Sequence, residues 1–141
     1  MIDTAIRTRL LSVAAVTTLV GDGDAARVWP VVLPQRAAPK WPAITYQMIS
    51  GRPDYELAAV AGVALIRIQI NCWSGVRPEH DAYAEARALA EAVRGALSGF
   101  SGTIGSDVIQ TCFLENRISQ YDDETQTHWE MLDFVVGYTE A

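Results

Sequence analysis

Residues 63–73 read VALIRIQINCW, and this stretch decides the fold class of the chain. Apolar and polar side chains alternate along it. Successive side chains of a β-strand point to opposite sides of the sheet, so the alternation is typical of a strand with one buried face. The apolar set is Ile66, Ile68, Ile70 and Cys72, and the polar set is Arg67, Gln69 and Asn71. We expect a long strand over Val63–Trp73 whose apolar side packs on a core.

Four other segments predict further strands of the same sheet, and a fifth predicts a connection between two of them. Arg27–Trp29 is a brief apolar run stopped by a proline, and Ala43–Ser50 alternates like the long strand. Asp107–Leu114 and His128–Tyr138 are alternating runs later in the chain. The polar stretch Asn116–Thr127 between them predicts a connection that lies outside the sheet.

The N-terminal segment predicts an amphipathic helix followed by a second, short helix. Apolar residues recur there at steps of three or four, the spacing of one buried helical stripe. They are Ile2, Ile6, Leu10 and Val13. Ser12 is expected to cap the second helix, which runs to Val20, and Gly21 fits the left-handed position after a helix end.

A longer helix is predicted after the third strand. Pro78 suits its first turn, where the carboxylates of Glu79 and Asp81 complement the helix dipole, and Gly99 ends it. Its buried stripe is Ala82, Ala86, Leu89, Val93 and Leu97. The small alanines of this stripe allow the helix to lie close to a sheet.

These elements predict a single domain over residues 1–141 of the α+β class. The expected order is helix, three strands, helix and two strands. The sheet is expected to be mostly antiparallel, with the N-terminal helix and the long central helix packed on one face.

Composition excludes several classes of protein. Half of the 141 residues are apolar and 20% are charged, which is typical of a globular chain. The net charge of -6 disfavours tight binding to nucleic acid, because an acidic surface repels phosphate. No apolar run reaches the roughly 18 residues that span a bilayer, so we expect no membrane association. Cys72 and Cys112 lie in apolar runs and are expected to be buried, reduced thiols.

No combination of residues predicts a catalytic, cofactor-binding or metal site. His80 and His128 lack a second ligand at metal spacing, and nothing around Cys72 lowers a thiol pKa as a nucleophile paired with His128 would need. The acidic turns at 22–24 and 122–124 do not complete a calcium loop. We therefore predict no enzyme activity and no bound cofactor.

Two segments are candidates for contacts with other subunits. Residues 30–42 contain four prolines, which predicts an extended irregular loop of a length that is often functional. Tyr55–Gly62 is apolar without a clear period, and it predicts either a hairpin arm or a mobile flap. The predicted contact residues are Leu33, Pro34, Trp41, Tyr55, Leu57 and Val60. Sheet edges that an assembly would cover are a further candidate.

The order of short motifs along nearly the full chain resembles one known family. The motifs are Arg27-Val28-Trp29-Pro30, Leu33-Pro34-Gln35, Trp41-Pro42-Ala43-Ile44-Thr45-Tyr46-Gln47, Arg67-Ile68-Gln69-Ile70-Asn71-Cys72-Trp73, Gly95-Ala96-Leu97 and Leu132-Asp133-Phe134-Val135-Val136. Each is weak alone, but their order and spacing are similar to those of the tail-completion, or tail-terminator, proteins of siphophage-type tails. Members of this family are also called minor tail or head–tail joining proteins.

The resemblance implies a structural virion protein at the head–tail junction. It implies a homo-oligomeric ring, expected to contain six copies, that caps the finished tail tube and offers a surface to the head–tail connector protein. DNA would pass through the lumen without specific binding, and assembly would take place in the cytoplasm of the bacterial host. The family has no catalytic residues to transfer to this chain.

Two other interpretations remain open at the level of sequence. One is a connector or stopper subunit on the head side of the neck, which would bind the portal-side ring and not the tail tube. The other is a small intracellular enzyme or ligand-binding domain with a pocket beneath the Pro30–Pro42 loop. Phage, prophage and gene transfer agent are not distinguished by these residues.

Overall fold

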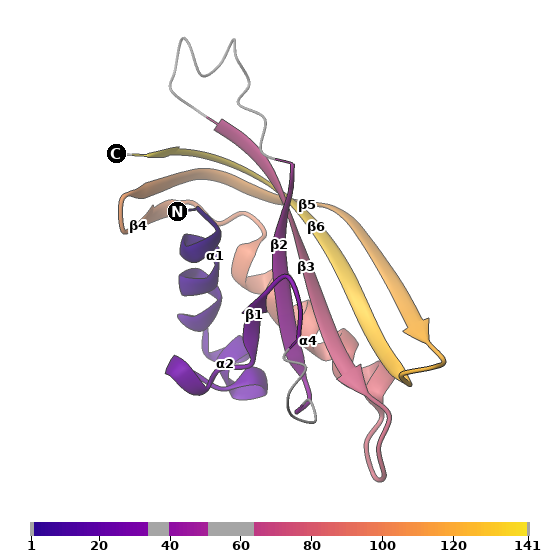
Figure 1. The fold of residues 1–141 in the computed structure, drawn as a ribbon. Helices are drawn as coiled ribbons and strands as arrows, with labels where there is room; N and C mark the ends of the chain where they lie inside the picture. Colours follow the sequence, from indigo (N-terminus) through magenta and orange to yellow (C-terminus); the bar gives the residue numbers. More distant parts are fainter. Residues whose placement is uncertain (1, 34–39, 51–63, 141) are drawn as a thin grey trace.

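The computed structural model of the chain describes residues 2–33, 40–50 and 64–140 (Figure 1). Its helical elements are α1 (Ile2–Leu11), α2 (Ala14–Val20), the short 3-10 turn η1 (Gly23–Ala25) and α4 (Ala82–Leu97). Its strands are β1 (Val28–Pro30), β2 (Ala43–Ser50), β3 (Ala64–Gly75), β4 (Gly102–Ile104), β5 (Asp107–Asp122) and β6 (Thr127–Glu140). The predicted α+β class is confirmed.

The strands form one sheet in the order β1-β2-β3-β6-β5-β4. Only β1 and β2 are parallel; the other described pairs are antiparallel. β6 follows all other strands in sequence and lies between β3 and β5. Its pairing with β3 extends without a shift from Ala64 opposite Tyr138 to Gly75 opposite Thr127.

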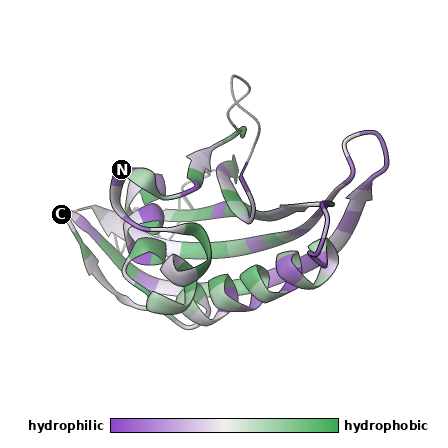
Figure 2. Ribbon diagram, turned by 90° about the horizontal axis from the view of Figure 1, so that it is seen from below, coloured by the Kyte–Doolittle hydropathy of each residue, from purple (hydrophilic) through white to green (hydrophobic). Residues whose placement is uncertain are grey.

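All described α-helices pack on one face of this sheet, and the core lies between the two layers (Figure 2). The stripe predicted for α4 is confirmed, because all five of its residues are buried. α1 and α2 lie against α4 and contribute Ile6, Leu10 and Val20 to the same core. The sheet contributes Ile68, Ile70 and Phe134, which are all 1% exposed or less.

The expected polar connection over Asn116–Thr127 is wrong. β5 continues through Asp122, and β6 begins at Thr127, so only a tight turn joins the two strands. In this turn the Glu124 amide donates to Asp122 Oδ1 at 2.9 Å. The outer half of β5 carries mostly exposed side chains. An edge strand of this kind lacks the alternating burial that identifies a strand in sequence.

Two predicted helix starts also differ from the structure. Ser12 does not cap α2; its hydroxyl donates to the carbonyl of Arg9 at 2.6 Å and closes the end of α1, while Val13 occupies the cap position. α4 begins at Ala82, and Asp81 caps it by accepting the Ala84 amide at 3.0 Å. The chain turns before Asp81, with Glu79 at a φ of 65°, so Pro78 lies outside the helix.

Gly21 follows the second helix, as predicted, and its backbone has a positive φ. Gly21 has a φ of 85°, a conformation that side chains with a Cβ rarely adopt. Its amide donates to the carbonyl of Thr17 at 2.8 Å and ends α2. Arg27 then secures the return of the chain, because its guanidinium donates to the carbonyls of Leu19 and Pro42.

Candidate assembly surface

The second face of the sheet carries no described helix, and we call it the open face. Strand register defines it: residues that lie opposite one another across paired strands point to the same side. Gln69 lies opposite Asp133, and Asn71 lies opposite Met131. The open face is continued on β5 by Asn116 opposite Asp133, Ile118 opposite Met131 and Gln120 opposite Trp129.

Tryptophan side chains gather on this face. Trp73 and Trp129 lie opposite each other on β3 and β6, and their rings stack at 4.7 Å between centroids. The Trp73 indole nitrogen donates to the Thr45 hydroxyl of β2 at 2.9 Å. Trp29 is opposite Thr45 in the parallel pair and therefore points to the same side. Tryptophans anchored in this way are typical of protein interfaces.

Trp41 lies over the end of β3 at Gly75. A Cβ placed on Gly75 would be 2.5 Å from Cε2 of Trp41, so the indole occupies the space that any larger residue would need. Gly75 follows Trp73 by two positions and is therefore on the open face. Trp41 thus covers one end of this face without being fully buried.

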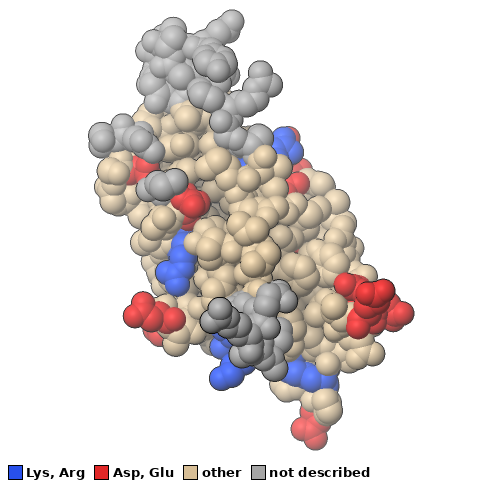
Figure 3. All heavy atoms as spheres, in the orientation of Figure 1, with Lys and Arg blue, Asp and Glu red and all other residues tan. Residues whose placement is uncertain are grey.

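Large apolar side chains at the margins of the open face are exposed to solvent. They are Ile49 (46% exposed), Phe113 (50%) and Ile118 (39%). Charged side chains lie mainly around the rim of the molecule in the view of Figure 3, which has the orientation of Figure 1. One of the ion pairs, Arg67 with Glu115 at 2.6 Å, is about 40% exposed. A face of this composition is more apolar than a solvated sheet face normally is.

Polar groups in the middle of the open face are almost all hydrogen-bonded. Gln69 accepts from Gln47 at 3.2 Å and from Asn71 at 3.4 Å, and its own amide nitrogen points at the sulfur of Met131 at 2.6 Å. Asp133 is the exception. Its Oδ1 is shielded from solvent and has no hydrogen-bond partner among the described residues.

The structure describes two of the six predicted contact residues, Leu33 and Trp41, and their role in subunit contacts stays a prediction. Leu33 is half-buried, and Trp41 is on the open face as described. Pro34, Tyr55, Leu57 and Val60 lie outside the described residues, so their proposed role stays a prediction. The predicted contact residues did not include Trp73, which has the same phase along its strand as the polar residues of Val63–Trp73. The signal in the sequence was a tryptophan at a position where the alternation of this strand otherwise places polar side chains.

The helix side holds two clusters of charged residues, and both serve the fold. Arg117 of β5 donates to the buried Glu130 of β6 and to Glu91 of α4, and so ties α4 to the sheet. At the other end of α4, Glu85 accepts from Ser74 at 2.7 Å and from Arg77 at 2.9 Å. These are positioning contacts between a helix and the strands beneath it.

The residues considered for metal or nucleophilic chemistry lie in unfavourable surroundings. His128 packs between Tyr83 and Tyr121, and His80 lies on the exposed turn before α4. No three His, Cys, Asp or Glu side chains are grouped for metal binding in the described part of the chain. Cys72 and Cys112 are buried and free, as predicted. Burial raises the pKa of the Cys72 thiol far above its usual range and that of Cys112 to about 12, so both thiols are held protonated.

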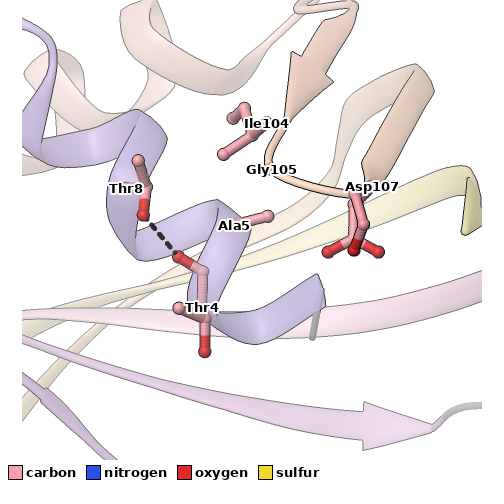
Figure 4. Close-up of a pocket in the computed structure, with 7 residues that line it drawn as sticks. Thr4, Ala5, Thr8, Ile104, Gly105 and Asp107 are labelled. Carbon is pink, nitrogen blue, oxygen red and sulfur yellow. Dashed lines mark hydrogen bonds between the residues drawn. The ribbon is translucent and has the colours of Figure 1, made fainter. Parts of the chain in front are cut away.

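A shallow pocket of about 360 Å³ lies between α1 and the turn from β4 to β5 (Figure 4). Thr4, Ala5 and Thr8 line one side, and residues 104–107 line the other. The Thr8 hydroxyl donates to the Thr4 carbonyl at 3.0 Å and is thereby used within α1. Asp107 is the one ionisable side chain among these lining residues, so they do not form an acid–base pair.

None of the helices in residues 2–33, 40–50 and 64–140 has the length and apolar character that crossing a membrane requires. On the open face, the tryptophans give the described surface the aromatic composition of a protein contact.

Residues 4–139 match the family model described as Tail completion protein gp17. The structure is similar to a chain in the solved virion of a native gene transfer agent (GTA) particle. That similarity has a TM-score of 0.69 and 17% sequence identity, and it covers 98% of this chain and 93% of the other. At this identity it shows that the fold is shared. No curated protein sequence matches the chain.

Proposed function

Since the chain belongs to the Tail completion protein gp17 family, we propose that it ends tail growth by capping the tail tube as a homo-oligomeric ring. The single observation that carries this proposal is the extent of the family match, which reaches from residue 4 to residue 139. The shared fold with a chain of a gene transfer agent virion supports the same role.

The ring is proposed to contain six copies, as the family resemblance implies. A ring requires head-to-tail contacts, in which two different surfaces of one subunit meet on its neighbours and the rotation closes. The two layers of this fold supply two such surfaces, the open face and the outer side of the helices. One end of the ring would bind the tail-tube protein and the other the head–tail connector, after assembly in the host cytoplasm.

DNA is proposed to pass through the lumen without specific binding. The net charge of -6 supports this, because phosphate gains nothing from a surface rich in Asp and Glu. A map of the assembled ring with a lumen lined by Lys and Arg would contradict it. The proposed role also requires no catalysis, and the buried, protonated thiols of Cys72 and Cys112 agree with that.

Electron microscopy and native mass spectrometry test the proposal directly. The purified protein is measured alone and after mixing with purified, polymerising tail-tube protein. We expect rings of six copies, or tubes that carry added density at one end and stop growing. A protein that leaves tube length unchanged and binds only a portal-side ring would overturn capping in favour of the neck-connector role.

A further inference from the structure

We propose that the free edge of β5 binds an extended, basic segment of the tail-tube protein, which adds to the sheet as a further strand. The free edge is the side of β5 that faces away from β6 between Asn116 and Asp122. This inference rests on the proposed function, since it names the surface through which the tube is held. Main-chain hydrogen bonds supply affinity in such a contact, and side chains at alternate positions supply selectivity.

β5 is paired along its whole length on one side, but only at its start on the other. Its pairing with β6 runs from Asp107 to Asp122, whereas β4 pairs only with Asp107–Ile109. The Gly99 amide donates to the carbonyl of Cys112 at 2.7 Å, and beyond this bond no described segment pairs with the outer side of β5. In Figure 1 this part of β5 is the right-hand margin of the sheet. An unpaired edge is a template for another strand.

The strand register shows which backbone groups of the edge are free. Along an antiparallel pair, residues that bond to the partner strand alternate with residues whose amide and carbonyl point to the opposite side. The carbonyl of Cys112 bonds to Gly99, so Cys112 points away from β6. The bulge between Leu114 and Asn116 then shifts the alternation by one residue. The outward amides and carbonyls of the free edge therefore belong to Arg117, Ser119 and Tyr121.

The free edge lacks the features that usually prevent strand addition. Exposed edges are normally protected by prolines, lysines, bulges or inward-pointing charges. Residues 116–122 contain no proline and no lysine, and they pair with β6 without a register shift. The one basic side chain, Arg117, is held on the helix side by Glu130 and Glu91. A regular edge with this little protection is typical of a strand-addition site.

The side chains beside the edge define the character of the added segment. Ile118 on the open face is 39% exposed and Tyr121 on the helix side is 47% exposed, so apolar residues of an added strand would be covered on both sides. At the end of β5 lie Asp122, Asp123 and Glu124, which form no ion pair with another described residue. These carboxylates and the net charge of -6 favour a segment with Lys or Arg where it meets the turn.

A second copy of the chain offers no matching edge among its described strands. β1 ends the sheet on the other side, but Pro30 has no amide hydrogen and its carbonyl already accepts from Val32 at 2.7 Å. β4 is only three residues long. Pairing of β5 with β5 of another copy is two-fold symmetric, so it gives a closed pair and does not repeat around a ring. Capping requires a contact with the tail tube, which is therefore the proposed source of the strand.

Hydrogen exchange of the wild-type protein tests the inference without any substitution. Exchange is measured residue by residue for the protein alone and bound to purified, polymerised tail-tube protein. The outward amides of Ser119 and Tyr121 are expected to exchange about tenfold or more slowly on the tube. The amides of Ile118 and Gln120 bond to β6, so they are expected to be protected in both states and serve as the internal control.

A substitution tests the same edge by removing one outward donor. Ser119→Pro leaves the bonds between β5 and β6 in place, because the Ser119 amide points away from β6, and it is expected to bind tubes about tenfold or more weakly in cosedimentation. Ser119→Ala keeps the donor and is the matched control, expected to bind like wild type. If circular dichroism shows that Ser119→Pro is unfolded, the exchange measurement on wild type decides.

The charge of the segment is tested at the turn. Asp123→Lys combined with Glu124→Lys is expected to weaken tube binding about tenfold and to reduce its dependence on salt. Binding at wild-type strength and with the same salt dependence would overturn the basic character of the segment.

The remaining outcomes separate this inference from the capping function. A protein that caps tubes while Ser119 and Tyr121 exchange freely would overturn the edge contact and leave capping standing. Protection of these amides in rings without tube protein would assign the edge to a second copy, and protection by the head–tail connector alone would assign it to the connector; both overturn the inference. A wild-type protein that does not bind tubes would overturn both proposals.

Discussion

The two faces of β3 and β6 differ although they share the same strands. On the covered face, Ile68 and Phe134 are at most 1% exposed and pack beneath the helices. One residue further along each strand, Gln69 and Val135 are only half-buried. The covered face is completed by its own chain, and the open face combines tryptophans, amides and a carboxylate that its own chain leaves partly uncovered. The difference separates residues that make the core of the fold from residues that we propose contact other subunits.

The largest expected effect tests the covered face. Phe134→Ala removes a fully buried ring from the centre of the core, and it is expected to lower the free energy of unfolding by about 3–5 kcal/mol. Val135→Ala, the next residue, is on the open face and is expected to cost less than about 1 kcal/mol. Urea denaturation measures both. Equal losses for the two neighbours would remove the distinction between the faces.

A second change probes the end of the open face where Trp41 lies. Gly75→Ala would place a Cβ within the indole, and it is expected to destabilise the fold by about 1–3 kcal/mol and to shift the tryptophan fluorescence. Gly95→Ala is the matched control, because nothing lies within 4 Å of its added Cβ and it sits inside α4. That change is expected to stabilise by up to about 1 kcal/mol. A Gly75→Ala variant as stable as wild type would show that Trp41 is free to leave this face.

A third measurement tests whether the tryptophan stack of the open face is formed before assembly. A double-mutant cycle with Trp73→Leu and Trp129→Leu is expected to give a coupling free energy of about 0.5–1.5 kcal/mol, since the rings stack at 4.7 Å. Both single variants are also expected to form fewer rings than wild type. Zero coupling in thermal unfolding would mean that the stack forms only in the assembly.

The smallest expected effect concerns the margin of the covered face, where Glu85 accepts from Ser74 and Arg77. Burial raises the pKa of Glu85, but these two hydrogen bonds and the charge of Arg77 together outweigh it, so the pKa lies below its usual value. A carboxyl with a lowered folded pKa stabilises the fold above its unfolded pKa. That contribution is lost as pH falls through the lowered value.

Glu85→Gln removes the titrating group, so the variant is expected to lose less stability than wild type on acidification. Thermal melting between about pH 3 and pH 6 measures the difference. If the melting temperature falls equally with pH in the variant and in wild type, the role given to Ser74 and Arg77 is contradicted. The open face should be unaffected, so ring formation at neutral pH serves as an internal comparison.

Sequence predicted the covered face well because burial on one side leaves a periodic pattern. The alternation of Val63–Trp73 and the stripe of α4 report directly on a face that excludes water, and both are found in the structure. The outer half of β5 left no such pattern, since Asn116 and Ser119 are exposed on opposite sides of an edge strand. Polar residues there are compatible with either a strand or a loop.

The candidate surface was harder to predict for a related physical reason. The open face mixes apolar and polar residues, so in sequence it resembles a solvated face. Trp73 followed three polar residues of the same phase, and Asp133 lay within an apolar run. Only strand register brings Trp73 next to Trp129. The contact roles predicted for Leu33, Pro34, Trp41, Tyr55, Leu57 and Val60 all remain predictions.

The position of β6 in the sheet has a consequence for how the chain is made on the ribosome. β6 follows every other described strand in sequence, yet β3 and β5 both pair with it and α4 packs across it. While β6 is still being synthesised, β3 and β5 lack their common neighbour and the core lacks Leu132, Phe134 and Val136. The domain can therefore complete folding only after translation has passed residue 140. A chain that lacks β6 cannot form the sheet described here.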